Sequence, residues 1–438
     1  MESKSTKFVR VLSSNFSDFC NDVDKTYKYY LMSKKAINEN FRITKEKHKE
    51  AFFIADQFDS LYKTKPSKID ETIKNILNKD ISSSNKKIKD VIEDIGFEND
   101  IIAYRLKSTL TKNNKYDPNF ARDASFSLNY LLKTAKTSFL SNVVMVFEQF
   151  LSNLYYSLIY YHMERYIEGK TIPLKSLLNS NVDDIFSSEV DYIVEKDMYD
   201  SFSLLNKIFE KENIGIEYAN GVLEEFGEIY YRRNAYVHNR GFANQQYLCK
   251  NPKSKTKLGD YLKCDDNYLK NVAVTVKKLI FFISFSLIAK NEFDSDDLKE
   301  IIDYCFDSLC NNEYDFCEYV YKYLSLSNKL ENVDRMIARV NLLICLKETK
   351  KTDSFNEEIR RFDVSAADNM FVIAKHILLD QFKEANDLIV ETYDKEKTPA
   401  ELMHWPLYQH FRETSFFTKI KENKAKDFNL QEIDQNDQ

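Results

Sequence analysis

Residues 139–161, FLSNVVMVFEQFLSNLYYSLIYY, are the stretch that decides the fold. The stretch is apolar almost all round at helical spacing, so it predicts a buried helix, which we place within a longer helix over 124–168. Glu148 is a lone carboxylate in this apolar stretch, and such a charge is costly to bury unless a cation pairs with it. We therefore expect Arg232 or Arg233 as its partner. The alternative is that Glu148 lies on a solvent-facing strip of the helix.

The composition extends this helical prediction to the whole chain. The 438 residues include only 7 glycines and 6 prolines, which are the residues that tight β-turns need. Periodic runs rich in Lys, Glu, Leu and Ile fill the sequence instead. We predict an all-α fold of two or three domains.

The predicted helices divide the chain into four parts. Residues 123–292 hold four helices, over 124–168, 174–210, 217–240 and 261–290, which is the outline of an antiparallel four-helix bundle. An N-terminal helical region, residues 1–122, precedes the bundle. Residues 293–424 form a third region of paired amphipathic helices, and residues 425–438 a polar tail.

The two outer regions consist of further helices. In the N-terminal region we predict helices over 8–40, 41–62, 67–80 and 84–111, followed by a linker over 112–122 that contains Pro118. In the third region we predict helices over 296–311, 314–326, 333–348, 354–361, 366–381, 383–394 and 405–423. These pairs resemble degenerate helical-hairpin repeats of the tetratricopeptide type, which implies a possible binding surface for a protein partner.

Charge, cysteines and hydropathy exclude several classes of protein. The net charge of −6 argues against nucleic-acid binding by the whole surface, so any such contact is local. The 7 cysteines show no CxxC pair and no histidine at ligand spacing, so we predict reduced thiols in the cytoplasm, and neither a metal site nor a cofactor. The apolar run 279–289 is too short to span a bilayer, so we predict a buried core helix and no membrane contact.

The chemically richest segment is residues 230–241, YYRRNAYVHNRG, at the end of the third bundle helix. Gly241 after a periodic segment predicts a helix stop. Asn234 and His238 are four residues apart and share a helix face, whereas Arg233 and His238 are about 140° apart around the axis. Either the Arg233 side chain wraps around the helix, or the helix is distorted, or a second copy of the chain completes the site. We favour the last.

This segment resembles the signature of the HEPN superfamily of four-helix ribonucleases. The similarity rests on the Arg-Arg-Asn-Ala-Tyr-Val-His-Asn-Arg-Gly string of residues 232–241, on the apolar helix around Glu148 and on downstream residues 244–248. It covers residues 124–291. The resemblance implies a metal-independent endoribonuclease that acts as a homodimer or higher homo-oligomer, with the motif helices lining a shared cleft. It also implies a role in anti-phage defence, as an abortive-infection effector or toxin.

The chemistry of these residue types agrees with RNA cleavage. The 2′-hydroxyl of RNA is the nucleophile, a histidine can move the protons, and an arginine can bind the phosphate and neutralise its developing charge. We assign proton transfer to His238, phosphate binding to Arg233 and orientation to Asn234. Auxiliary residues are Arg232, Asn239, Arg240 and Glu148, with further phosphate contacts from 250–257.

Two alternatives remain open for the same segment. The cations and the histidine could simply occupy the end of a helix, where the helix dipole favours positive charge. The whole protein would then be a non-catalytic helical scaffold that dimerises through the bundle and binds a partner through its repeats.

Overall fold

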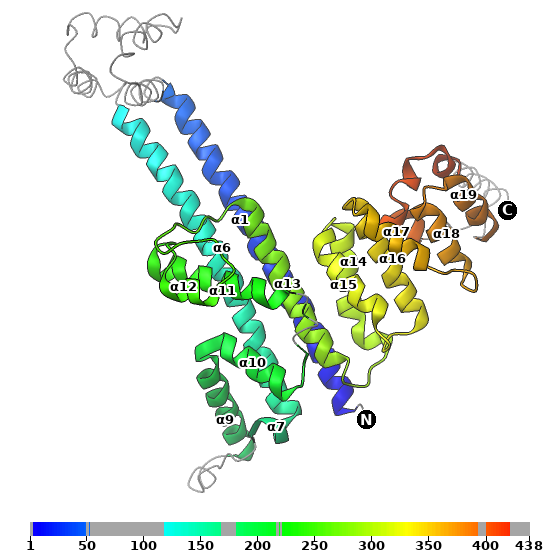
Figure 1. The fold of residues 1–438 in the computed structure, drawn as a ribbon, viewed down its shortest axis with the longest axis horizontal. Helices are drawn as coiled ribbons and strands as arrows, with labels where there is room; N and C mark the ends of the chain where they lie inside the picture. Colours follow the sequence, from blue (N-terminus) through cyan, green and yellow to red (C-terminus); the bar gives the residue numbers. More distant parts are fainter. Residues whose placement is uncertain are drawn as a thin grey trace, which may run out of the picture. The chain divides into compact units, whose positions relative to one another are not determined.

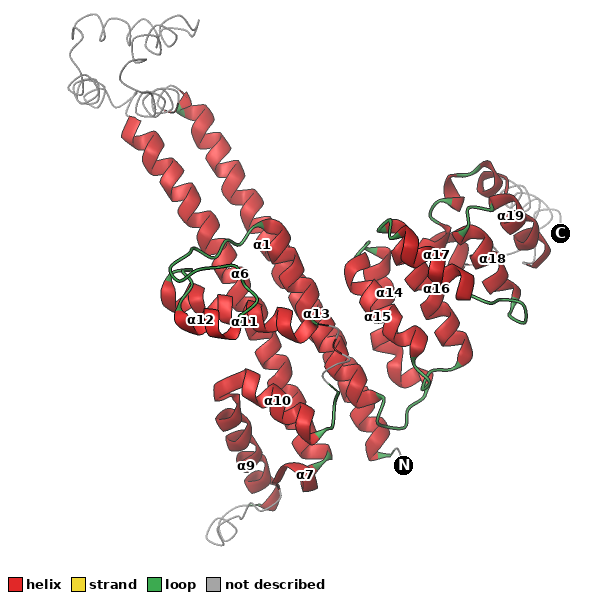
Figure 2. Ribbon diagram, in the orientation of Figure 1, coloured by secondary structure: helices red, strands yellow, loops and turns green. Residues whose placement is uncertain are grey.

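The computed structural model describes residues 3–49, 52, 118–167, 181–215, 219, 221–392 and 400–420. Within these ranges the regular structure is helical, and the only β-type pairing is an isolated antiparallel bridge between Phe242 and Tyr261 (Figure 2). The all-α prediction is thus confirmed for the part of the chain that the structure describes. The predicted helices over 67–80 and 84–111 and the polar tail lie outside the described residues.

The chain forms two compact units. One unit contains residues 25–142, and the other contains residues 1–24 together with 143–438. The limits of these units differ from the boundaries at 122 and 292 that we drew from the sequence, because two long helices each take part in both units.

The smaller unit pairs the later part of α1 (Lys4–Lys47) with the first part of α6 (Pro118–Tyr161) (Figure 1). The ring of Phe139 lies 5.6 Å from that of Tyr27 and 5.3 Å from that of Tyr30. The predicted break between residues 40 and 41 is wrong: α1 continues through this point, where the sequence has neither glycine nor proline. The predicted linker over 112–122 is wrong from Pro118 onward, because proline is favoured in a first helical turn.

The larger unit is built around the second half of α6. Large apolar side chains on this part of the helix, Phe147, Phe150, Leu151, Leu154 and Leu158, are at most 1% exposed. The predicted buried helix is therefore confirmed. It ends earlier than predicted, at Tyr161, and a short helix α7 (Met163–Ile167) follows.

The described part of the predicted helical region 174–210, from residue 181 onward, forms two helices, and residues 174–180 lie outside the described residues. The two helices are α9 (Val182–Asp197) and α10 (Ser201–Lys211), joined by the 3-10 turn η3 (Met198–Asp200). The break falls at Asp200, whose carboxylate accepts hydrogen bonds from the backbone N–H groups of Phe202 and Ser203. Such an N-cap satisfies the first free donors of a helix, so it starts a new one.

Three helices complete the central part of the larger unit: α11 (Val222–Asn239), α12 (Gln245–Lys250) and α13 (Asp266–Ile288). Helix α12 lies between the predicted helices 217–240 and 261–290, where we predicted no helix. By length and composition α13 could cross a membrane, but 78% of its most apolar window is buried inside the structure. The prediction of a buried core helix over this run is thus confirmed.

The C-terminal helices follow the predicted pairs closely. They are η5 (Ser295–Leu298), α14 (Lys299–Cys310), α15 (Tyr314–Leu326), α16 (Asn332–Glu348), α17 (Thr352–Arg361), α18 (Asn369–Leu378) and α19 (Phe382–Thr392). The predicted helix 405–423 is wrong in its first part. The chain there forms α20 (Ala400–His404) and the 3-10 turns η6 (Pro406–Tyr408) and η7 (Phe411–Glu413).

A buried cation connects the start of the chain to this unit. Lys277 of α13 is 2% exposed, and its ammonium pairs with Asp24 of α1 at 2.7 Å and with Glu313, just before α15. Asp24 also accepts a hydrogen bond from Tyr304 of α14. Residues 1–24 therefore belong to the fold of the larger unit.

Candidate active site

Helix α11 ends where the sequence predicted. Arg240 adopts a left-handed conformation (φ 54°), Gly241 follows at φ 87°, and the Gly241 N–H donates to the Ala235 carbonyl at 3.0 Å. A Cβ atom on Gly241 would lie 2.9 Å from the Tyr261 ring, so this position requires glycine both for its backbone angle and for space.

Arg233 makes the ion pair that the sequence led us to expect. Its Nη2 lies 2.7 Å from Oε1 of Glu148 on α6, and the two side chains are only 20% and 27% exposed. The same Oε1 accepts a hydrogen bond from Ser201 of α10 at 3.1 Å. Glu148 thus joins three helices and is paired, which excludes the alternative of an unpaired solvent-facing residue.

The Arg233 guanidinium makes one ion pair, and not every one of its N–H donors has a hydrogen-bond partner among the described residues. Its Cζ lies 5.0 Å from the ring centroid of Tyr230, a distance that favours a cation–π contact. Its buried Nε has no hydrogen-bond partner within the described residues. Burial raises the pKa of Tyr230, and the nearby Arg233 partly opposes this shift. The Nε of Arg233 is therefore an enclosed donor that no group among the described residues uses.

Arg232 occupies a different and fully engaged environment. Its Nε lies 2.7 Å from Glu228, Nη1 donates to the Lys263 carbonyl, and its Cζ stacks 4.3 Å from the Tyr268 ring centroid. Glu228 also accepts from Tyr247 at 2.7 Å and from Tyr268 at 2.9 Å. Burial, the largest influence, lowers the pKa of Arg232, but Tyr268 and Glu228 raise it overall. Arg232 is a structural cation here.

His238 and Asn234 lie toward the end of the helix. His238 is exposed, and its imidazole makes no hydrogen bond or ion pair within the described residues. Asn234, one turn earlier, is half-buried and likewise free within these residues. Asn239 donates to the Phe242 carbonyl at 2.7 Å, which supports the turn after the helix, and Arg240 is exposed at the C-cap.

The structure brings Arg233 together with Glu148 and leaves His238 apart from them. Helix α11 is a continuous α-helix through Asn239, so helix distortion does not bring Arg233 and His238 onto one face. Arg233 and His238 therefore still lie about 140° apart around the helix axis. Of the three explanations we drew from the spacing, a wrapped Arg233 side chain is disfavoured because Glu148 holds it toward α6.

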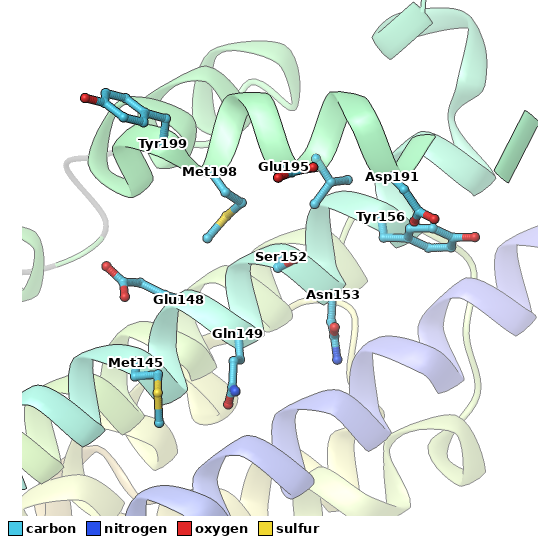
Figure 3. A pocket seen from close by; sticks show the side chains of 11 residues that line it. Met145, Glu148, Gln149, Ser152, Asn153, Tyr156, Asp191, Glu195, Met198 and Tyr199 are labelled. Carbon is cyan, nitrogen blue, oxygen red and sulfur yellow. The ribbon is translucent and has the colours of Figure 1, made fainter. Parts of the chain in front are cut away.

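An open pocket lies next to this ion pair. It has a volume of about 790 Å³ and is lined by Glu148 and other residues of α6 on one side and by α9 and η3 on the other. Figure 3 shows the Glu148 carboxylate directed into this space, below Met198. The pocket therefore gives solvent access to the acid that positions Arg233.

Sequence reasoning missed several residues that shape the site. Tyr247 and Tyr268, which bind Glu228 beside Arg232, come from α12 and α13; Tyr247 lies in the 244–248 stretch of the resemblance, but its contact with Glu228 was not predicted, and Tyr268 was not singled out. Ser201 was missed because the break at Asp200 was not foreseen. The carboxylate at Asp200 before a new apolar run was a detectable N-cap signal.

Comparisons with known proteins leave the family open. No family model, no curated protein and no solved structure matches the chain. Among the described residues, no group of three or more His, Cys, Asp or Glu side chains is placed to hold a metal ion.

Proposed function

We propose that this protein is a metal-independent endoribonuclease of the HEPN type. The observation that carries the proposal is the arrangement on α11. His238 is an exposed histidine without a partner among the described residues. Five residues earlier lies Arg233, whose guanidinium is 2.7 Å from Glu148 and whose buried Nε has no hydrogen-bond partner among the described residues. A mobile proton carrier and a positioned cation are what phosphodiester cleavage requires from a protein without a metal.

The reaction uses the nucleophile that RNA itself contains. His238 takes the proton of the 2′-hydroxyl as the 2′-oxygen attacks phosphorus, and Arg233 neutralises the charge that builds on the phosphate oxygens. The bond from phosphorus to the 5′-oxygen breaks, and that oxygen takes up a proton. The products are a 2′,3′-cyclic phosphate and a 5′-hydroxyl. Asn234 orients the phosphate or the imidazole.

A second copy of the chain completes the site in this proposal. The angular separation of Arg233 and His238 on a straight α11 is resolved if His238 of one subunit and Arg233 of the other act on the same phosphate. The two histidines of a two-fold dimer would supply the acid and the base. In this arrangement α6, α9–α10, α11 and α13 form the antiparallel four-helix bundle, and the C-terminal helical pairs receive a protein trigger in an anti-phage response in the cytoplasm.

Lysines beyond the motif are suited to hold the RNA strand. Lys253, Lys255 and Lys257 are exposed and form no ion pair within the described residues. Their loop is closed at its base by a hydrogen bond from the Leu262 N–H to the Gly241 carbonyl at 2.8 Å, which keeps it next to the His238 end of α11. A local basic loop is how an acidic protein can still contact phosphates.

A scaffold without catalytic activity is the second candidate. The observation that favours it is the enclosure of Arg233, which is only 20% exposed and connects α11 to α6 through Glu148. In that case Arg233 stabilises helix packing, and His238 has no chemical role.

One experiment separates the two candidates. The full-length protein is incubated with total RNA in EDTA, next to the variants His238→Ala and His404→Ala. His404 is an exposed histidine at the end of α20 with no side-chain partner among the described residues, so it is a matched control. We expect the first variant to lose about 10²–10⁴-fold in cleavage rate and the second to match the wild type.

The products and the oligomeric state provide independent checks. The cleaved RNA should carry termini that are ligated only by an enzyme that accepts 2′,3′-cyclic phosphates. The cleavage rate per subunit should rise with protein concentration in step with dimer formation. If wild type and His238→Ala leave RNA equally intact, also in the presence of extracts from phage-infected cells, the scaffold is the better description.

A further inference from the structure

The pocket beside Glu148 is a groove between two helices. Its α6 wall is made by Met145, Glu148, Ser152 and Tyr156, residues three to four positions apart that form one continuous face of the helix (Figure 3). Residues 145 to 156 cover about 16 Å at 1.5 Å per residue, which is about three helical turns. The opposite wall comes from α9 and η3. A groove of this length with helical ridges on both sides has the dimensions to hold a third helix.

Two carboxylates of the groove have no counter-charge among the described residues. Asp191 and Glu195 of α9 make no ion pair there. Glu148 is paired with Arg233 through Oε1, which also accepts a hydrogen bond from Ser201. The lining contains neither lysine nor arginine. Two unpaired negative charges on one wall of the groove favour a cationic occupant.

Apolar side chains lie among these charges. Met145 is 48% exposed and Tyr199 is 96% exposed, and Met198 also lines the groove. Binding of a partner that removes these exposed apolar side chains from water is favourable. The flexible methionine side chain can adapt its conformation to different partners. The groove therefore offers apolar area for one face of an occupant and carboxylates for its flanks.

We propose that this groove binds a basic amphipathic helix of a partner protein, about three turns long, with Leu or Met on one face and Lys or Arg on its flanks. The pairing follows from charge complementarity together with the apolar lining. The site differs from the RNA-cleaving residues and does not depend on the proposed function. It lies next to the Glu148–Arg233 pair, so a bound helix would reach the environment of Arg233.

The binding test uses synthetic peptides and the full-length protein. The probe is a fluorescently labelled peptide of about 14 residues with Leu and Lys at helical spacing. Two control peptides accompany it: one has the same composition with the helical spacing scrambled, and one has Glu in place of Lys. The variant Asp191→Lys/Glu195→Lys reverses two groove charges, and Asp184→Lys/Glu189→Lys makes the same change at exposed positions of α9 outside the pocket lining.

We expect the basic amphipathic peptide to bind the wild type and the Asp184→Lys/Glu189→Lys variant equally. The groove variant should bind it at least about tenfold more weakly, and the two control peptides should bind poorly to every form. Circular dichroism shows whether each variant keeps its helices. The proposal is overturned if the peptide binds both double variants equally, if the scrambled peptide binds as well as the amphipathic one, or if none binds the wild type.

Discussion

Two neighbouring arginines on α11 differ in the groups that hold their guanidinium ions. Arg232 and Arg233 are adjacent in sequence and about 100° apart around the axis. Arg232 faces Glu228, Tyr268 and the Lys263 carbonyl, and Tyr268 in turn donates a hydrogen bond to Glu228. Arg233 has one carboxylate partner and a buried Nε without a hydrogen bond among the described residues.

The two guanidinium groups differ in how completely the fold supplies hydrogen-bond acceptors for their N–H donors. A charged group whose donors are all used inside the fold stabilises that fold and has little left for a ligand. A positioned cation with spare donor capacity is suited to bind an anion such as phosphate. The sequence analysis assigned phosphate binding to Arg233 and an auxiliary contact to Arg232, and the packing around the two residues differs. This comparison makes opposite predictions for the two substitutions.

The largest effect is expected for Arg233→Ala, on catalysis. Loss of the cation that stabilises the developing phosphate charge should lower the rate of RNA cleavage by about 10²–10³-fold. The free energy of unfolding should fall by only about 1 kcal/mol, since the pair with Glu148 is partly exposed. Single-turnover cleavage of a short labelled RNA and urea unfolding measure the two quantities. An unchanged cleavage rate would show that Arg233 only connects helices.

Arg232→Ala should show the reverse pattern. Removing this guanidinium leaves the Glu228 carboxylate without its cation and the Lys263 carbonyl without this donor, so we expect the free energy of unfolding to fall by roughly 2–3 kcal/mol. Cleavage by the folded fraction should stay close to that of the wild type. Arg360→Ala, at an exposed position of α17, is the control and should change stability by less than about 0.5 kcal/mol. Equal losses of stability for both arginines of α11 would contradict the comparison.

The smallest effect is expected for Tyr247→Phe, and it depends on pH. Burial, with Glu228 second, raises the pKa of Tyr247 from 10.0 to about 12. The folded protein thus holds this proton more tightly than the unfolded chain. The contribution of the Tyr247 hydroxyl to the free energy of unfolding is fully present below pH 10 and is lost as the pH rises toward 12.

The measurement is urea unfolding of wild type and Tyr247→Phe from pH 8 to 12. The phenylalanine variant should be less stable by about 1 kcal/mol at pH 8, and this gap should narrow toward pH 12. Tyr199→Phe serves as the control, because Tyr199 is 96% exposed and should change neither value. A gap that stays constant with pH would mean that the Tyr247 hydroxyl does not titrate in this way.

The sequence was informative where one physical requirement dominated. The C-terminal helix pairs were predicted to within a few residues because each carries a regular apolar face between polar turns. The Glu148–Arg233 pair was foreseen because a lone carboxylate in an apolar helix needs a cation. The stop after α11 followed from Gly241, at which the chain has a φ of 87°.

The sequence was less informative where the structure depends on distant contacts. The continuity of α1 through residue 41 was missed because its polar residues resembled a boundary. The surroundings of Arg232 could not be predicted, since Tyr247 and Tyr268 follow α11 by many residues in segments without a matching period. The roles of His238 and Asn234 stay predictions, because the structure shows their exposure and not their substrate.

The burial of Lys277 limits how this chain can be divided. Its ammonium is neutralised by Asp24 near the start of the chain and by Glu313 far along it, although Lys277 itself lies within the segment that resembles a ribonuclease domain. A fragment of residues 123–292 would lack both carboxylates and also the rings of Tyr304 and Phe316, which lie 5.7 and 5.0 Å from the Lys277 ammonium. This face of α13 would then be exposed to water, so we expect the fragment to be less stable than the full chain.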